Sequence, residues 1–280
     1  MDDLTITHVG GPTVLLEVGG WRILTDPTFD PPGRRYGFGW GTSSTKLVGP
    51  AVAMGDLGRV DLVLLSHDHH ADNLDDAGRA LLADVPIVVT TRPGARRLDE
   101  TTGDVRGLAA WATTRVVGPG RPDLVVTATP CRHGPPLSRP VAGAVVGFAL
   151  RWDDRASGAG SGPGREPVDV WVSGDTVAHD GTREVVRRLD VDVAVLHLGG
   201  VRFGLTGPLR YSMTGADAVE LVAALRPRVV VPVHYEGWSH FADGRADVER
   251  AFAGAPPDVE ARVRWLAHGT PTVVSAPVTG

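Results

Sequence analysis

The segment Val60–Gly78, VDLVLLSHDHHADNLDDAG, decides the fold and points to the chemistry of the protein. Its first half is an apolar run of the kind that forms a buried strand. Five polar side chains follow at once: His67, Asp68, His69, His70 and Asp72. Such groups are costly to bury unless they are paired or bind an ion. A helix cap would account for Asp72 alone, but no capping rule requires three histidines. The cluster therefore predicts a metal site.

Further ligand-type residues follow other apolar runs of the chain. They are His133 after TATPCR, Asp175 after VWVSG, His197 after VAVL, and His234 after VVVPV, with His240 behind it. The ends of neighbouring strands can direct several side chains to one point. Imidazole and carboxylate together suit zinc, manganese or iron, and the lack of cysteine in the cluster argues against a closed structural zinc site. The isolated His8, His179 and His268 are better explained as surface or hydrogen-bonded residues.

The composition limits the class of protein and its partners. Of 280 residues, 42% are hydrophobic and 22% are charged, which is typical of a globular protein. A net charge of −5 gives no electrostatic footprint for nucleic acid, and no apolar run is long enough to span a membrane. The acidic N-terminus and the lone Cys131 favour the cytoplasm. Arginine supplies all the positive charge except Lys46, a pattern typical of a high-GC bacterial genome.

The order of strand and helix patterns predicts a mixed α/β fold in one domain over residues 1–280. The opening strands lack helices between them and should pair as antiparallel hairpins, whereas later strands alternate with helices. Helices are expected over 73–83, 181–189 and 215–225. The Gly/Ser/Pro-rich segment 153–167 is expected to be a loop tip between two strands. The aperiodic segment 29–41 is expected to be a functional loop.

At this point the chain resembles the metallo-β-lactamase superfamily of hydrolases. SHDHHADN stands where that family has T/S-H-x-H-x-D-H, and His133, Asp175 and His234 match its later ligands in order. HVGGPTVLLEVGGWRILTDP and the late SMTGADAVELVAALRPRVVVPVHY resemble the branch with ascorbate-6-phosphate lactonases and N-acyl-phosphatidylethanolamine phospholipases. The resemblance implies an αββα sandwich with one or two ions at one edge of the sheets. Zinc is the expected ion, with manganese or iron as alternatives.

The opening motif departs from the family pattern. Counting from its start makes His67 and His69 ligands, whereas counting back from Asp72 favours His70 and implies one inserted residue. The first reading is preferred here and His70 is kept as a candidate. Asn73 stands where a second-site histidine belongs, so the second metal position, formed by Asp72, Asp175 and His234, is expected to be the weaker one.

The resemblance also implies a mechanism, the hydrolysis of a small ester, lactone, amide or phosphodiester. A metal-activated water would attack the substrate, and Asp72 or Asp175 would orient that water. His197 and His240 are candidates for proton transfer or substrate contact, Asp26 for support of a ligand histidine, and Tyr235 and Trp238 for the pocket wall. A non-catalytic metal-binding protein and a flavin-linked redox enzyme are the alternatives, although no flavin-binding motif is evident. A homo-oligomer is left open.

Overall fold

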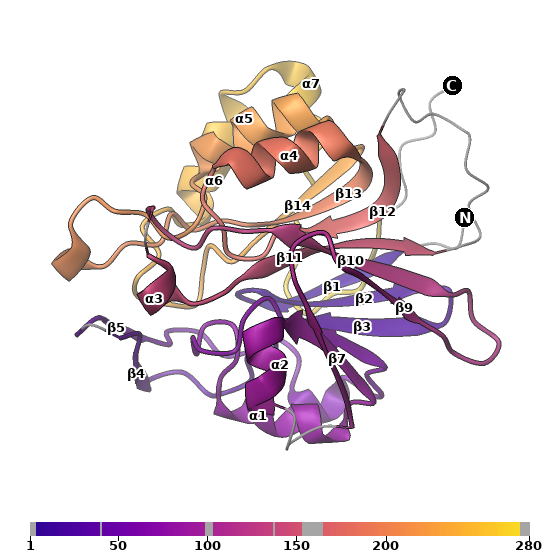
Figure 1. Cartoon of the computed structure of the whole chain (residues 1–280). Helices are drawn as coiled ribbons and strands as arrows, with labels where there is room; N and C mark the ends of the chain where they lie inside the picture. The colour runs from indigo at the N-terminus through magenta and orange to yellow at the C-terminus, as the bar shows by residue number, and fades with distance from the viewer. Residues whose placement is uncertain (1–3, 40, 99–102, 137, 153–164, 275–280) are drawn as a thin grey trace.

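Two facing β-sheets with helices on both outer sides form the protein (Figure 1). The computed structural model describes residues 4–39, 41–98, 103–136, 138–152 and 165–274. A large apolar cluster lies between the sheets and includes Ile6, Leu64, Phe148 and Val231. Two further clusters join each sheet to its covering helices. The predicted αββα sandwich is confirmed.

The first sheet has the strand order β15-β1-β2-β3-β6-β7-β8. Strands β1 to β3 pair as antiparallel hairpins, as predicted, and β3, β6, β7 and β8 run parallel. The bounds are β1 Thr5–Gly10, β2 Thr13–Val18, β3 Trp21–Thr25, β6 Leu62–Leu64, β7 Ile87–Thr91, β8 Asp104–Leu108 and β15 Thr272–Val273.

The second sheet has the order β14-β13-β12-β11-β10-β9. Strands β12, β13 and β14 run parallel, and β10 has the same direction because β11 is antiparallel to both β10 and β12. The chain therefore leaves these four strands at one edge of the sheet. The bounds are β9 Thr113–Val116, β10 Leu124–Pro130, β11 Val146–Trp152, β12 Glu166–Val172, β13 Leu189–His197 and β14 Val229–Val233.

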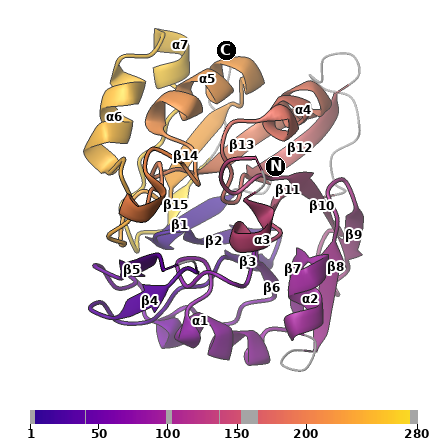
Figure 2. The same cartoon turned by 60° about the vertical axis from the view of Figure 1, so that its left-hand side comes forward.

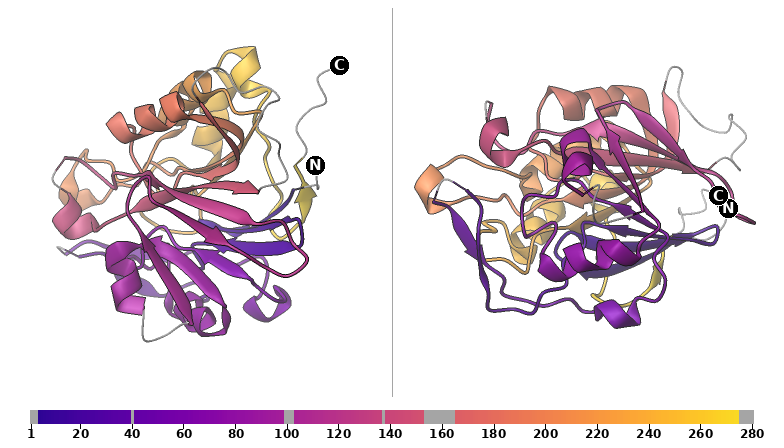
Figure 3. Two further views of the ribbon diagram at one scale, coloured as in Figure 1. Left: turned by 45° about the vertical axis from the view of Figure 1, so that its right-hand side comes forward. Right: turned by 60° about the horizontal axis from the view of Figure 1, so that its bottom comes forward.

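The helices form the two outer layers, with α4 to α7 over the second sheet and α1 and α2 over the first (Figures 1 and 3). Their bounds are α1 Asp76–Leu81, α2 Arg92–Leu98, α3 Arg139–Ala142, α4 Asp180–Arg188, α5 Gly215–Leu225, α6 Arg245–Ala253 and α7 Pro257–Glu260, with 3-10 turns at Met54–Asp56, Leu82–Asp84 and Gly204–Thr206. The helix predicted over 215–225 is confirmed, and that over 181–189 is displaced by one residue. The helix predicted from 73 begins later, because Asp75 rather than Asp72 caps it.

Segment 29–41 is more ordered than its sequence indicates. It carries β4 (Arg35–Gly37), which pairs with β5 (Ser43–Thr45) to form a small hairpin, here called the flap hairpin. The flap hairpin lies on the same side of the molecule as α3 and the 204–206 turn (Figure 2). Lys46, directly after β5, forms a buried ion pair of 2.7 Å with Asp75 at the start of α1. The flap hairpin is thus tied to the first helix.

The predicted loop 153–167 lies mostly outside the described residues, since 153–164 are not among them. The strands on either side, β11 and β12, pair antiparallel, as expected for two strands joined by a loop tip.

Candidate metal centre

Three imidazole nitrogens meet beyond the ends of β6 and β10. His70 Nδ1 lies 3.2 Å from His67 Nε2 and 3.1 Å from His133 Nε2. Zinc bonds to nitrogen of about 2.0–2.1 Å in a tetrahedron would separate the ligand atoms by about 3.3 Å. Both contacts of His70 Nδ1 therefore have the spacing of two ligands of one ion.

The protonation of these histidines also suits a metal. His133 Nδ1 donates to the carbonyl of Tyr211 at 2.6 Å, so in the neutral ring its Nε2 presents a lone pair. Burial, with the neighbouring imidazoles, lowers the pKa of His67 and of His70 well below the usual value, so both rings are neutral near pH 7. Neutral imidazole is the form that binds a metal.

His69 points elsewhere. Its Nε2 hydrogen-bonds to the carbonyl of Ala142, and its ring lies so close to Gly143 that an added Cβ would be 2.1 Å away. Its Nδ1 has no hydrogen-bond partner in the part of the chain that the structure describes, and His67, His69 and His70 can each offer one nitrogen within 4.8 Å of the others. The geometry nevertheless favours His70 over the preferred His69, because only His70 is close to both His67 and His133.

Asp72, Asp175 and His234 form a second group of possible ligands within 4.8 Å of one another. His234 Nε2 is 3.6 Å from Asp72 Oδ2 and 3.6 Å from Asp175 Oδ2, while its Nδ1 lies 3.2 Å from the carbonyl of Leu198. Burial alone would lower the pKa of His234, but the two carboxylates outweigh it and raise the pKa to about 9. His234 Nε2 and Asp175 Oδ1 are buried without a hydrogen-bond partner in the described part of the chain. A carboxylate oxygen and an imidazole nitrogen buried in this way could each offer a lone pair to a bound cation.

Asp26 and His197 lie behind these ligands. Asp26 Oδ1 accepts the backbone N–H of Ser66 at 2.7 Å, and its Oδ2 is 3.3 Å from His197 Nε2. Burial raises the pKa of the Asp26 carboxyl group, although His197 acts against this. Asp26 thus holds the residue that precedes His67, as the sequence analysis expected of a supporting residue. His197 is fully buried, a position that favours support over the predicted contact with substrate.

Neither of the two aromatic residues predicted to line the pocket is among the residues that line the hollow over His70 and His133. Tyr235 is buried among the residues under the outer helices and contacts Trp265, so the structure does not support it as a pocket residue. Trp238 packs against Tyr36 and Phe38 beneath the flap hairpin. Trp238 therefore supports Phe38, which lines the hollow, and does not line the hollow itself.

Phe38 and Phe203, which were not predicted from the sequence, lie at the entrance to the group formed by His67, His70 and His133. Together with Tyr211 and Thr206 they line a hollow of about 30 Å³ over His70 and His133. Phe203 also lies parallel to His240, with ring centroids 5.3 Å apart. The aromatic residues of segments 29–41 and 201–211, which follow no helix or strand periodicity, could have indicated this entrance from the sequence.

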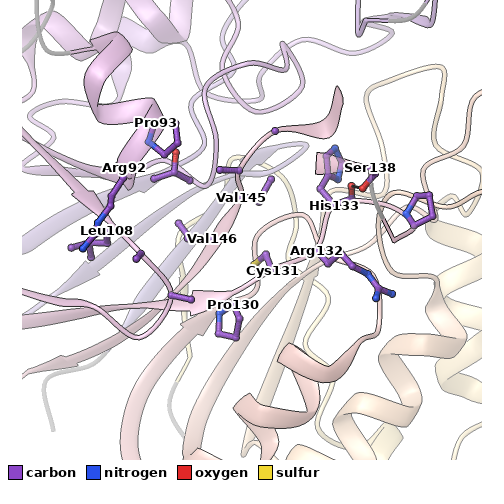
Figure 4. Close-up of a pocket in the computed structure, with 16 residues that line it drawn as sticks. Arg92, Pro93, Leu108, Pro130, Cys131, Arg132, His133, Ser138, Val145 and Val146 are labelled. Atoms are coloured by element: carbon purple, nitrogen blue, oxygen red, sulfur yellow. Dashed lines mark hydrogen bonds between the residues drawn. The ribbon is translucent and has the colours of Figure 1, made fainter. Parts of the chain in front are cut away.

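A larger cavity of about 560 Å³ adjoins the site through His133 and Gly143 (Figure 4). Figure 4 shows Arg92 and Arg132 on opposite sides of Val145 and Val146. The larger cavity is lined by one of the possible ligand histidines, His133, whereas the smaller hollow is lined by His70 and His133, so we regard the smaller hollow as the place where the reacting bond would lie.

One group of possible ligands lies apart from these two positions. His8 is buried and its Nε2 lies 3.0 Å from the carbonyl of Gly11, while His268 pairs with Glu236 at 2.6 Å. His179 caps α4. The three isolated histidines thus lie in hydrogen bonds or ion pairs, as expected from the sequence.

Comparison with known proteins supports this assignment of the fold. Residues 21–235 match the model of a family described as the beta-lactamase superfamily domain. A UPF0173 metal-dependent hydrolase from Methanoregula boonei is 27% identical over 241 residues, 85% of this chain and 84% of that protein. Another from Caldivirga maquilingensis is 25% identical over 222 residues, 79% of this chain and 77% of that protein.

Solved structures show the same fold. The isothiocyanate hydrolase from Delia radicum gut bacteria has a TM-score of 0.76 at 20% identity and covers 97% of this chain and 100% of its own. A metallo hydrolase from Ignicoccus hospitalis has a TM-score of 0.69 at 20% identity and covers 98% of this chain and 99% of its own.

The fold, the family model and the relatives define a metal-dependent hydrolase. The chain belongs to the metallo-β-lactamase superfamily. No helix in the described ranges is both long and apolar enough to cross a membrane.

Proposed function

We propose that the protein uses a metal-activated water to hydrolyse a small uncharged substrate, with zinc as the resident ion and manganese or iron as alternatives. The observation that carries this proposal is the convergence of His67 Nε2, His70 Nδ1 and His133 Nε2 under a hollow that opens between Phe38 and Phe203. When bound, an ion there would supply Lewis-acid activation of the water and of the bond to be cleaved.

The protein's own groups would orient the reaction. Both carboxylate oxygens of Asp72 face hydrogen-bonding groups, since Oδ2 is 3.0 Å from His240 Nε2 and Oδ1 faces the Asn73 amide. Asp175 Oδ1 is buried at the site and has no hydrogen-bond partner among the described residues. Of the two predicted candidates, Asp175 is therefore the better group to accept a hydrogen bond from the attacking water and hold its proton.

The lining of the hollow argues for a neutral substrate. Aromatic and small residues surround it, and the described residues that line it include neither arginine nor lysine. Apart from the proposed metal ions, the hollow offers no cationic side chain to bind the oxygens of a phosphodiester, so we favour an ester, a lactone, an amide or another small electrophile. The isothiocyanate hydrolase of similar fold acts on a substrate of that last kind. A cytoplasmic location, a single domain and the lack of a nucleic-acid partner stay predictions from the sequence.

The test is a substrate screen with the zinc-, manganese- and iron-loaded protein. Neutral esters, lactones, amides and isothiocyanates should be turned over, and phosphodiesters should be poorer substrates. His133→Ala serves as the metal-poor variant and His179→Asn as a control with one histidine fewer and a retained helix cap. Stoichiometric metal without turnover of any class would favour the non-catalytic alternative.

A further inference from the structure

The second metal position has an imidazole that the sequence motif does not predict. Asp72, Asp175 and His234 form this position, and residue 73, where the family has a histidine, is an asparagine. His240, six residues after His234, places its Nε2 3.0 Å from Asp72 Oδ2. Two segments far apart in the chain thereby meet at the carboxylate.

Asn73 is oriented as a donor. With the amide assigned from its surroundings, its nitrogen lies 3.2 Å from Asp72 Oδ1 and 3.2 Å from Asp175 Oδ2, and its other end faces Ser66 Oγ. The side chain is fully buried and has no freedom to turn its oxygen toward the carboxylates without facing two acceptors. Asn73 therefore sets the direction of both carboxylates and is unsuited to act as a ligand.

The His240 ring is fixed by its packing. Phe203 lies parallel to it, the ring centroids of Phe38 and Phe241 are 5.1 and 4.7 Å away, and its Nδ1 hydrogen-bonds to Ser44 Oγ. A hydrogen bond on one ring nitrogen that directs the other nitrogen inward is usual for a metal-binding histidine.

The contacts that His240 and His234 make with Asp72 are close to the spacing of two ligands of one ion. Ligand atoms of a tetrahedral zinc lie about 3.3 Å apart. The contact between His240 Nε2 and Asp72 Oδ2 is 3.0 Å, and the two contacts of His234 Nε2 with Asp72 and Asp175 are 3.6 Å. His240 is also only 6% exposed, so its nitrogen faces the site and not solvent.

We propose that His240 replaces the histidine missing at position 73 as the imidazole ligand of the second metal ion, while Asn73 aligns Asp72 and Asp175 for that ion. The inference rests on the proposed metal-dependent function. It replaces the expectation, drawn from Asn73 alone, of a weak second site.

The test is a titration of the metal-free full-length protein with Co²⁺ alone, followed by visible absorption and by metal content after dialysis. Wild type should bind two ions per chain. His240→Ala should keep the first and bind the second at least a hundredfold more weakly. His240→Gln can still donate to Asp72 but lacks an imidazole, and should lose the second ion equally. His179→Asn should behave as wild type.

A rescue variant separates a lost ligand from a damaged fold. Asn73→His combined with His240→Ala returns an imidazole to the family position and should recover part of the second site, with thermal melting of the metal-free variants as the check on folding. Retention of the second ion by His240→Gln would overturn the ligand role, because a hydrogen bond to Asp72 would then suffice. Binding of a single ion by wild type would overturn this inference alone, whereas binding of none would overturn the proposed function as well.

Discussion

Replacing His70 by alanine should damage metal binding far more than replacing His69. His70 Nδ1 lies within 3.2 Å of two other imidazole nitrogens, whereas His69 hydrogen-bonds to the backbone at Ala142. Removing His70 takes away one of three converging nitrogens. Removing His69 takes away a hydrogen bond to the backbone at Ala142 and none of the three converging nitrogens, so metal affinity should change far less.

The size of the effect on stability follows from the linkage of binding to folding. An ion present at 100 times its dissociation constant stabilises the native state by about 2.7 kcal/mol. A hundredfold loss of affinity in His70→Ala would leave about 0.4 kcal/mol of that stabilisation at the same ion concentration. The difference of about 2.3 kcal/mol corresponds to a fall in Tm on the order of 5 °C for a chain of this length.

The assay is thermal melting of wild type, His69→Ala and His70→Ala, each with and without Zn²⁺. The difference between the two melts isolates binding from any change in the metal-free fold. Wild type and His69→Ala should gain clearly more from Zn²⁺ than His70→Ala. If His70→Ala keeps the full gain and His69→Ala loses it, the ligand spacing is H-x-H, as the sequence analysis preferred, and the assignment from geometry is wrong.

Three further predictions concern the rest of the site and its support. His234→Ala and Asp175→Asn should abolish hydrolysis, because each removes a proposed ligand of the second ion, and normal turnover in either variant would remove that residue from the ligand set. In the metal-free protein, burial lowers the pKa of His8 to about 4, so stability should fall as pH decreases from 6.5 toward 4, because the unfolded chain binds the proton first. The carboxylates of Asp175 and Asp72 raise the pKa of His234 to about 9, so the stability that this ion pair gives the metal-free protein is present below pH 6.5 and is lost toward pH 9. The melting temperature measured from pH 4 to 9 should therefore pass through a maximum. A flat profile would contradict this prediction. Lys46→Met should lower the free energy of unfolding in urea by about 3 kcal/mol, because it leaves the buried Asp75 carboxylate unpaired, and Lys46→Met/Asp75→Asn should recover part of the loss.

The strand runs and their polar ends predicted most of the site, because parallel strands deliver the residues after them to one edge. His67, His133, Asp175 and His234 lie where that argument places them. The choice between His69 and His70 could not be made from spacing alone. It depends on how the loop after β6 turns, and the contacts of His69 with Ala142 and Gly143 come from a segment more than 70 residues away.

Contacts between loops were the part that the sequence could not predict. Asp72 was a plausible helix cap, but Asp75 fills that position and accepts the N–H groups of Phe29 and Asp30 as well. The partners Ser44 and His240 are separated by 196 residues, and no periodicity links them. Tyr235 follows a ligand histidine and suggested a pocket residue, although its side chain turns under the outer helices.

The buried pair of Lys46 and Asp75 also makes the flap hairpin open to a simple proteolytic measurement. Lys46 is the chain's sole lysine and is 3% exposed, so a lysine-specific protease has one cleavage site and cannot reach it while the pair is closed. A single cut would divide the chain into residues 1–46 and 47–280, which places Ser44 and its partner His240 on different fragments. The rate of that cut therefore reports how often the flap hairpin detaches from α1, with no label and no substrate required.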